Sequence, residues 1–306
     1  MEDKLGPIDF VVPFVNAADA NWQQLFLQYT PQSREDAVNS IVRFRSPGNF
    51  WKYFFRGIEK NLPWIRKVFL LVQSESQVPV WINKDSERIT IVTHDMFIPQ
   101  EFLPTFTSTT IEMFLWNIPG LSERFLYTND DTFAINPMDE ELFFKDGKLC
   151  NGPNTTVYQE SDLWKNHCLN GQALVFEKSK EDLKRESIVF SYSHSIRPYF
   201  KSVMTECYMK YQKEIAKSIS YFRTKDSINV YVYDDYNYVK QLFVRPWIRP
   251  TMISPRTGNG NIRPLLDSFA HTVCIQDTDQ ANNIYTHPIL NNWFKEHYPN
   301  KSCFEK

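Results

Sequence analysis

The chain has 306 residues, which is enough to bury a substantial hydrophobic core. Its 34 basic and 36 acidic residues nearly cancel, so the charge gives no indication of a nucleic-acid partner. The five cysteines are odd in number and contain no Cys-x-x-Cys pair, which argues against a zinc knuckle or a disulfide framework and favours a reducing cytoplasm. No run of about 18 apolar residues occurs, so we expect a cytoplasmic protein without a transmembrane segment, with membrane association limited to peripheral contact at the inner face of the cell membrane.

The N-terminal half alternates short apolar segments with segments of helical periodicity, which is typical of a largely parallel sheet with helices on both faces. The predicted strands cover residues 8–15, 68–72, 88–92 and 125–128. The predicted helices cover residues 22–29, 49–61 and 108–118. Thr109 and Glu112 have the spacing of a capping box at the start of the last helix. Asn16 follows the first strand in a loop at its carboxyl end.

Three arginines of this half are candidates for binding a phosphate group. Arg43 and Arg45 occupy alternate positions of an extended segment, so their side chains point the same way. The planar guanidinium group gives paired hydrogen bonds to phosphate, although solvent-exposed arginines fit the same pattern. Arg56 lies on the predicted helix at 49–61, off the densest part of its apolar stripe.

The strand at residues 125–128 runs directly into Asn129, Asp130 and Asp131. Two adjacent carboxylates at a strand end repel each other, so they need a partner such as a divalent cation or an arginine. Ligands of open α/β sheets bind at the carboxyl ends of the strands, which makes this segment a candidate site. A turn or a helix cap is the structural alternative.

The second half is predicted to be mainly helical. Its predicted strands cover residues 173–176 and 269–275, and its predicted helices cover 180–189, 197–218, 231–243 and 288–297. Residues 249–263 are rich in Pro, Gly and Asn and are predicted to form a mobile loop, as in a lid. We expect a single domain over residues 1–306, in which an α/β core at 1–178 and 264–306 carries a mainly helical insertion at 179–263.

Three residues of this half have positions that suit catalysis. His194 lies just before a predicted helix with Pro198 in its first turn, which suits a base held by a helix start, although a structural histidine fits equally. Arg223 follows a long predicted helix and is either a phosphate clamp or a cation that favours the helix dipole. Asp277 follows the strand at 269–275, giving a second acidic strand end that could converge with Asp130 and Asp131.

Together, four blocks of the chain resemble the four conserved regions of the Stealth family of hexose-1-phosphate transferases. That family includes bacterial capsular polysaccharide phosphotransferases and the enzyme that tags lysosomal proteins with N-acetylglucosamine phosphate. The blocks run from Ile8 to Asn16, from Arg43 to Asp131, from His194 to Pro198 with Phe222 and Arg223, and from Cys274 to Asp277. Gly57 stands where the family more often has serine.

The resemblance implies a glycosyltransferase-A-like α/β core and a single catalytic domain. It implies transfer of a hexose-1-phosphate, such as N-acetylhexosamine-1-phosphate, from a UDP-sugar to a glycan hydroxyl, forming a phosphodiester and releasing UMP. The acceptor would be an oligosaccharide or polysaccharide, lipid-linked or free, in the synthesis of a bacterial capsule or cell-surface polysaccharide.

The resemblance also implies roles for individual residues. The catalytic set corresponds to His194, Arg223, Asp130, Asp131 and Asp277. Substrate binding is expected from Asn129, Arg43, Arg45, Arg56 and Asn16. Asp131 and Asp277 are expected to hold Mg²⁺ or Mn²⁺, with Asp130 ordering the loop, because such ions take one or two carboxylates together with phosphate oxygens. Histidine suits the base, since it titrates near neutral pH.

Two other functions remain compatible with the sequence. A conventional metal-dependent glycosyltransferase would release UDP, and a non-catalytic module would only bind a nucleotide sugar or a glycan. The residues do not specify the sugar, the acceptor, the linkage, the oligomeric state, or whether the protein polymerises or transfers once.

Overall fold

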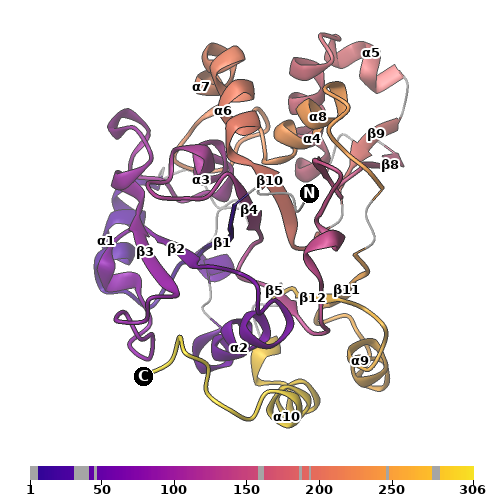
Figure 1. Ribbon diagram of the computed structural model, residues 1–306. Helices are drawn as coiled ribbons and strands as arrows, with labels where there is room; N and C mark the ends of the chain where they lie inside the picture. Colours follow the sequence, from indigo (N-terminus) through magenta and orange to yellow (C-terminus); the bar gives the residue numbers. More distant parts are fainter. Residues whose placement is uncertain are drawn as a thin grey trace.

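The structure is a computed structural model that describes residues 6–30, 41–44, 47–157, 162–185, 188–192, 194–245, 248–277 and 283–306. Its centre is a five-stranded sheet with the order β10-β4-β1-β2-β3 (Figure 1). The strands are β1 (Ile8–Pro13), β2 (Val68–Val72), β3 (Ile89–Thr93), β4 (Arg124–Tyr127) and β10 (Arg197–Phe200). All neighbours pair in parallel except β10, which runs antiparallel to β4.

A second sheet of three strands has the order β11-β12-β5. Its strands are β5 (Thr132–Ala134), β11 (Pro250–Ile253) and β12 (Thr272–Ile275), and β12 is antiparallel to β5. Residues 128–131 alone connect β4 to β5, so the predicted acidic segment passes from the first sheet to the second. Two smaller pairs are β6 (Phe144–Lys145) with β7 (Lys148–Leu149), and β8 (Asn154–Val157) with β9 (Ile188–Ser191).

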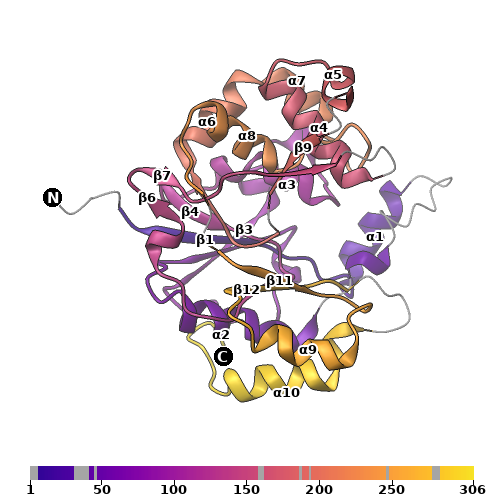
Figure 2. The same cartoon turned by 90° about the vertical axis from the view of Figure 1, so that its right-hand side faces the viewer.

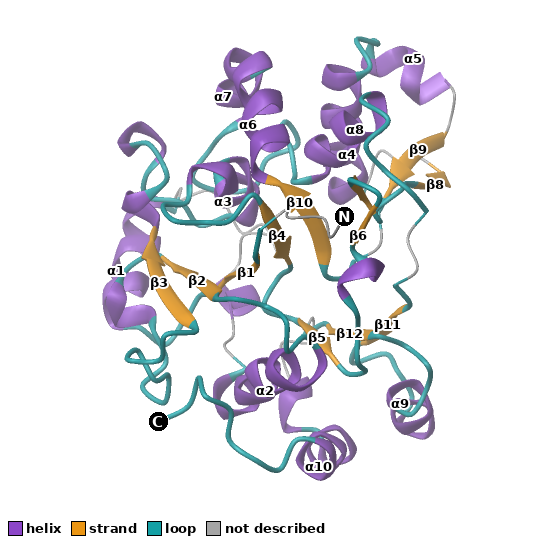
Figure 3. Ribbon diagram, viewed as in Figure 1, coloured by secondary structure: helices purple, strands orange, loops and turns teal. Residues whose placement is uncertain are grey.

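Helices cover both sides of the strands, as Figures 2 and 3 show. On one side lie α2 (Lys52–Asn61), α9 (Asn259–Leu266) and α10 (Pro288–His297). On the other lie α3 (Ser108–Met113), α4 (Leu163–Val175), α5 (Lys180–Arg185), α6 (Lys201–Lys210), α7 (Gln212–Ser218) and α8 (Tyr231–Val239), while α1 (Ala20–Tyr29) lies near β3.

Alternate residues of the central strands pack into two separate hydrophobic cores. Phe10 and Val12 of β1 belong to the core that contains α2 and α10, whereas Val11 between them belongs to the core that contains α8. This is the period of two expected of a strand with both faces covered. The predicted α/β class and mostly parallel sheet with flanking helices are confirmed.

Several elements of the second half differ from their predictions. Residues 173–175 belong to helix α4, and Phe176 caps it, so no strand forms here, because a short apolar run fits a buried helix equally well. The predicted helix at 180–189 ends at Arg185, and Ile188 begins β9. Residues 249–263 contain β11 and α9 and are therefore not an open loop.

The largest difference concerns the predicted helix at 197–218. Its first residues form strand β10, whose Arg197 and Phe200 pair with β4, and only the following residues form α6 and α7. Pro198 lies in this edge strand, where a missing backbone N–H is tolerated. His194 therefore precedes a strand of the main sheet and not a helix. The division into a core and an insertion at 179–263 stays a prediction, although β10 lies within that range and belongs to the main sheet.

The predicted capping box at the start of α3 is wrong. Thr107, not Thr109, caps the helix, because its hydroxyl accepts a hydrogen bond from the Thr109 backbone N–H at 3.3 Å. Glu112 points into the protein and is 5% exposed. Helix α3 also ends early, at Met113, followed by a short 3₁₀ turn at Leu115–Asn117.

Gly57 has a packing reason. A side-chain Cβ at this position of α2 would lie 2.6 Å from the carbonyl oxygen of Ala134 in β5, which is closer than atoms can approach. Glycine thus allows helix α2 to lie directly against the second sheet.

Candidate active site

A cavity of about 750 Å³ opens along the carboxyl ends of the main strands. Its lining includes Phe14 after β1, Gln73 after β2, His94 after β3 and Asn129 after β4. Since the parallel strands end at the same edge, the residues that follow them are brought together there.

All five residues predicted to act in catalysis line this one cavity, together with Asn129, which was predicted to bind substrate. The five are Asp130, Asp131, His194, Arg223 and Asp277. They come from four segments of the chain: the link between the two sheets, the approach to β10, the region before α8, and the end of β12. The convergence of the two acidic strand ends with His194 is therefore observed, while the roles of these residues stay predictions.

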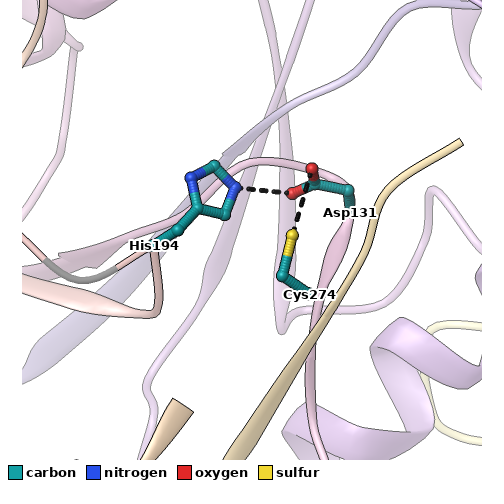
Figure 4. Close-up of side chains that lie close together, drawn as sticks. All are labelled: Asp131, His194 and Cys274. Atoms are coloured by element: carbon teal, nitrogen blue, oxygen red, sulfur yellow. Dashed lines mark hydrogen bonds and ion pairs between the residues drawn. The ribbon is translucent and has the colours of Figure 1, made fainter. Parts of the chain in front are cut away.

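Asp131 is the centre of the cluster in Figure 4. Its Oδ1 lies 3.2 Å from Nε2 of His194, and its Oδ2 accepts a hydrogen bond from Sγ of Cys274 at 3.5 Å. The Thr132 hydroxyl donates to Oδ1 at 3.1 Å. The backbone carbonyl of Asp131 accepts from the N–H of Ile275 at 2.7 Å, which ties the segment to β12. The position of this carboxylate is thus fixed by both sheets.

Asp131 and His194 stabilise each other's charged forms. Burial by itself would raise the pKa of Asp131, but the charge and hydrogen bond of His194 hold that pKa below its usual value. Burial likewise opposes protonation of His194, and the Asp131 charge outweighs it, so the pKa of His194 is raised. The two side chains are 25% and 31% exposed, and both reach the cavity.

Asp130 behaves in the opposite way. Burial and the neighbouring charge of Asp131 raise the pKa of Asp130 to about 7. Its backbone carbonyl accepts a hydrogen bond from the Trp51 indole at 3.1 Å, which fixes the segment against helix α2. The carboxyl group of Asp130 is therefore about half ionised at neutral pH, and a nearby cation would favour the ionised form.

Arg223 is held by residues of helix α3. Its Nη2 donates to the Ser108 hydroxyl at 2.8 Å. The buried carboxyl group of Glu112 accepts hydrogen bonds from the Tyr127 hydroxyl at 3.1 Å and from the Val230 backbone N–H at 3.0 Å. Burial raises the pKa of Glu112, and the Arg223 charge opposes that shift, so the two groups interact. The sequence had indicated Glu112 as a capping residue and as part of the block from Arg43 to Asp131, without a link to Arg223.

Arg56 does not line the cavity. Its guanidinium group makes two hydrogen bonds of 2.7 Å to the Glu305 carboxylate and donates to the Tyr298 carbonyl at 2.8 Å. These contacts anchor the C-terminal residues on helix α2. The predicted role of Arg56 in substrate binding is accordingly not supported.

Of the remaining predicted binding residues, Asn16 follows the lining residue Val15 without lining the cavity itself, and the two arginines lie partly or wholly outside the described residues. The Asn16 amide oxygen accepts from the backbone N–H of Ala18 at 3.1 Å, which shapes the loop after β1. The backbone of Arg43 belongs to a 3₁₀ turn, Ile41–Phe44, whose Phe44 lines the cavity. The side chain of Arg43 and the whole of Arg45 lie outside the described part of the chain.

The cavity also contains basic groups that the sequence analysis did not single out. Arg197 is buried, lies 2.5 Å from the Asp234 carboxylate and stacks between the rings of Tyr192 and Tyr231. His167 of α4 contacts the Thr224 carbonyl through Nε2 at 2.8 Å, beside Arg223. Arg197 stands within the block from His194 to Pro198, which was the available signal. His167 had no such signal.

The fold is that of an α/β protein, and acidic residues line its cavity at the carboxyl ends of the strands, where ligands of such proteins bind. Many transferases belong to this class. Residues 43–151 match the family model described as Stealth protein CR2, conserved region 2. This part of the chain is therefore similar to a conserved region of the Stealth family, as its motifs predict.

Two curated relatives have similar sequences. The capsular polysaccharide phosphotransferase fcs1 of Haemophilus influenzae is 28% identical over 319 residues, which cover 95% of this chain and 84% of that protein. The capsular polysaccharide phosphotransferase SacB of Neisseria meningitidis serogroup A is 32% identical over 247 residues, which cover 77% of this chain but only 43% of SacB. A solved structure of galactosyltransferase LgtC with donor and acceptor sugar analogs aligns over 96% of both chains at 10% identity and a TM-score of 0.45.

No helix in the described ranges combines the length and the apolar character that crossing a lipid bilayer requires.

Proposed function

We propose that this protein transfers a hexose-1-phosphate from a UDP-sugar to a hydroxyl group of a glycan, in the synthesis of a capsule or other cell-surface polysaccharide. The observation that carries the proposal is the meeting of Asp130, Asp131, His194, Arg223 and Asp277 on one cavity. The similarity to proteins named capsular polysaccharide phosphotransferases supports the same reaction class.

In the proposed reaction the acceptor oxygen attacks the phosphorus that carries the sugar. The bond from this phosphorus to the bridging oxygen of the diphosphate breaks, UMP leaves, and a phosphodiester between sugar and acceptor forms. The acceptor hydroxyl loses its proton, and His194, which lines the cavity, is the residue that we assign to accept it. Arg223 supplies positive charge for the equatorial phosphoryl oxygens in the transition state.

A divalent cation such as Mg²⁺ or Mn²⁺ fits the donor set of this site. Asp130, Asp131 and Asp277 offer carboxylate oxygens to one cavity, and the raised pKa of Asp130 reflects negative charge that a cation would balance. We assign Asp131 and Asp277 as the residues that would hold the ion. When bound, it would neutralise charge on the diphosphate and leaving group.

The ion pair between Asp131 and His194 affects whether His194 can act as the base. While Asp131 pairs with it, the pKa of His194 is raised, which favours the protonated form over the neutral form that can accept a proton. Engagement of the Asp131 carboxylate elsewhere would remove that partner and lower the pKa of His194. His194 would therefore become able to act as a base once Asp131 is bound to another group, such as the cation.

The identity of the released nucleotide tests the proposal. We expect UMP from UDP-N-acetylglucosamine, the probe to begin with, and a phosphodiester signal in the phosphorus NMR spectrum of the glycan product. Attack at the anomeric carbon would instead release UDP, which would identify a conventional glycosyltransferase. Binding of the donor with no nucleotide release under any acceptor would identify a binding module. Activity is expected to stop in excess EDTA and to return with Mg²⁺.

A further inference from the structure

Cys274 is the one member of the cluster in Figure 4 that the proposed transfer does not use. It is the third residue of β12, is 0% exposed, and lies beneath the Asp131 carboxylate, to which its thiol donates at 3.5 Å. Asp131 and His194 reach the cavity above it. An ion that enters from the cavity would thus meet an imidazole and a carboxylate first and a thiol directly below them.

The spacing of the three side chains suits a small tetrahedral ion. Nε2 of His194 lies 3.2 Å from one oxygen of Asp131, Sγ of Cys274 lies 3.5 Å from the other, and all three ligand atoms lie within 4.8 Å of one another. Zinc bonds of about 2.0–2.3 Å in a tetrahedral arrangement separate ligand atoms by roughly 3.3–3.5 Å. Both contacts of Asp131 are therefore close to the separations of such a set, and rotation of the side chains would bring the third pair, Nε2 and Sγ, into it.

The kinds of ligand distinguish zinc from magnesium. Thiolate and imidazole groups favour Zn²⁺, whereas Mg²⁺ takes oxygen ligands in an octahedral arrangement. Among the described residues, Asp131, His194 and Cys274 form the single group of three such side chains close enough to share an ion. Three protein ligands also leave a fourth position for water.

We propose that Asp131, His194 and Cys274 form a Zn²⁺-binding site whose occupation inhibits the enzyme. The inhibition rests on the proposed function, because a zinc bond to Nε2 of His194 occupies the base and a bond to Asp131 removes a ligand of the catalytic cation. Binding displaces the protons of the thiol and of Nε2, which pass to solvent. The site would make the transferase sensitive to free zinc while magnesium supports its activity.

The binding step is tested without substrate, by titrating Zn²⁺ into the full chain against a chromophoric zinc indicator, with Mg²⁺ present. The background variant Cys303→Ser removes the exposed thiol, which is a potential adventitious ligand. We expect one tight site per chain in this background. Cys274→Ser is expected to weaken it by at least about tenfold, since loss of a mere supporting partner of a ligand already costs about 10–100-fold.

The serine variant keeps a hydroxyl that can donate to Asp131, and its thermal unfolding is compared with that of the parent to establish that it folds. Inhibition is then read as nucleotide release with rising Zn²⁺. We expect Zn²⁺ to inhibit Cys303→Ser and to have at least about tenfold less effect on the variant that also carries Cys274→Ser.

Equal zinc affinity of Cys303→Ser and of the variant that also carries Cys274→Ser would show that Cys274 does not bind zinc. Zinc binding without inhibition would show that the site does not control the reaction. Failure of the proposed function would look different. In that case UDP replaces UMP, or no nucleotide is released, while the zinc titration still reports the site.

Discussion

Asp130 and Asp131 are neighbours in the chain, yet their carboxyl groups have pKa values shifted in opposite directions. Burial and the charge of Asp131 raise the pKa of Asp130 to about 7, whereas His194 lowers that of Asp131. The ionised form of Asp131 is thus stabilised within the protein, whereas the ionised form of Asp130 is destabilised. This difference leads to the first prediction.

Replacing Asp130 by asparagine is expected to stabilise the protein at pH 8 in the absence of divalent cations. The folded-state pKa of about 7 exceeds the ordinary value of 3.8, so the stability contributed by Asp130 is present below pH 3.8 and is lost as the pH rises through 7. The gain is at most about 4 kcal/mol, since partial exposure screens the charge. Urea unfolding at pH 8 and pH 4 measures it, and the gain should shrink at the lower pH. A less stable Asp130→Asn at pH 8 would contradict this account.

His194→Ala is expected to reduce nucleotide release by at least about 100-fold, the usual value of a general base. Affinity for the UDP-sugar, measured by calorimetry, should remain largely unchanged because the imidazole acts on the acceptor. Equal loss of turnover and donor binding would indicate a structural histidine.

The pH dependence of turnover should reveal the Asp131–His194 pair. A base whose pKa is raised is inactive at low pH, so kcat/KM, which reports the free protein, should rise with pH through a value above 6.5. In Asp131→Asn the partner charge is gone, and the midpoint of this limb should move to lower pH even though the rate itself is reduced. The measurement is a pH profile of nucleotide release by both proteins, and an unmoved midpoint would exclude His194 as the titrating base.

Glu112→Gln tests whether Glu112 positions Arg223. We expect kcat to fall by about 10- to 100-fold with a smaller change in KM, because a displaced guanidinium group stabilises the transition state less. A purely structural effect would lower the stability of the protein without this pattern. In an Arg223→Ala background the same substitution should have little further effect, since the group that it positions is absent.

Arg56→Gln is expected to lower the free energy of unfolding by about 3 kcal/mol while leaving donor affinity intact. The Glu305 carboxylate, whose side chain is 2% exposed, would remain buried without its partner. The double variant with Glu305→Gln should recover part of the loss. Chemical denaturation and donor titration are the two measurements. A weakened donor affinity would indicate that Arg56 contributes to substrate binding.

His94 offers a pH-dependent stability prediction. It is 5% exposed, neither ring nitrogen has a hydrogen-bond partner among the described residues, and burial lowers its pKa to about 4. Because the unfolded chain binds the proton more tightly, stability falls as the pH drops from 6.5 towards 4, by about 3 kcal/mol. When urea unfolding is compared at pH 7 and pH 4, the free energy of unfolding of His94→Leu should fall by about 3 kcal/mol less than that of the parent protein. An identical pH dependence in the variant would show that His94 does not titrate as described.

The buried strands and the terminal helix were predictable because their patterns are local. The apolar residues of β1, β2 and α10 have the periods of strand and helix, and their bounds agree closely with the predictions. The acidic segment at Asn129 was likewise recognisable, since a polar run after a buried strand marks the edge of the sheet where ligands bind.

The remaining differences come from contacts between distant residues. Residues 197–200 continue the helical pattern of α6, but pairing with β4 gives them strand geometry. Glu112 fits a local cap, whereas its partners Tyr127 and Val230 come from elsewhere in the chain. Arg56 was assigned to phosphate because its true partner, Glu305, lies 249 positions away.

Residues 128–131 connect the two sheets. The cluster of Asp131, His194 and Cys274 includes residues from both, since His194 precedes a strand of the larger sheet and Cys274 lies in the smaller one. A slight sliding of one sheet against the other would therefore change the spacing of the cluster without altering any of its residues. A substitution remote from the cavity should consequently lower the rate of the reaction. An example is a larger side chain at Gly57, where helix α2 meets β5.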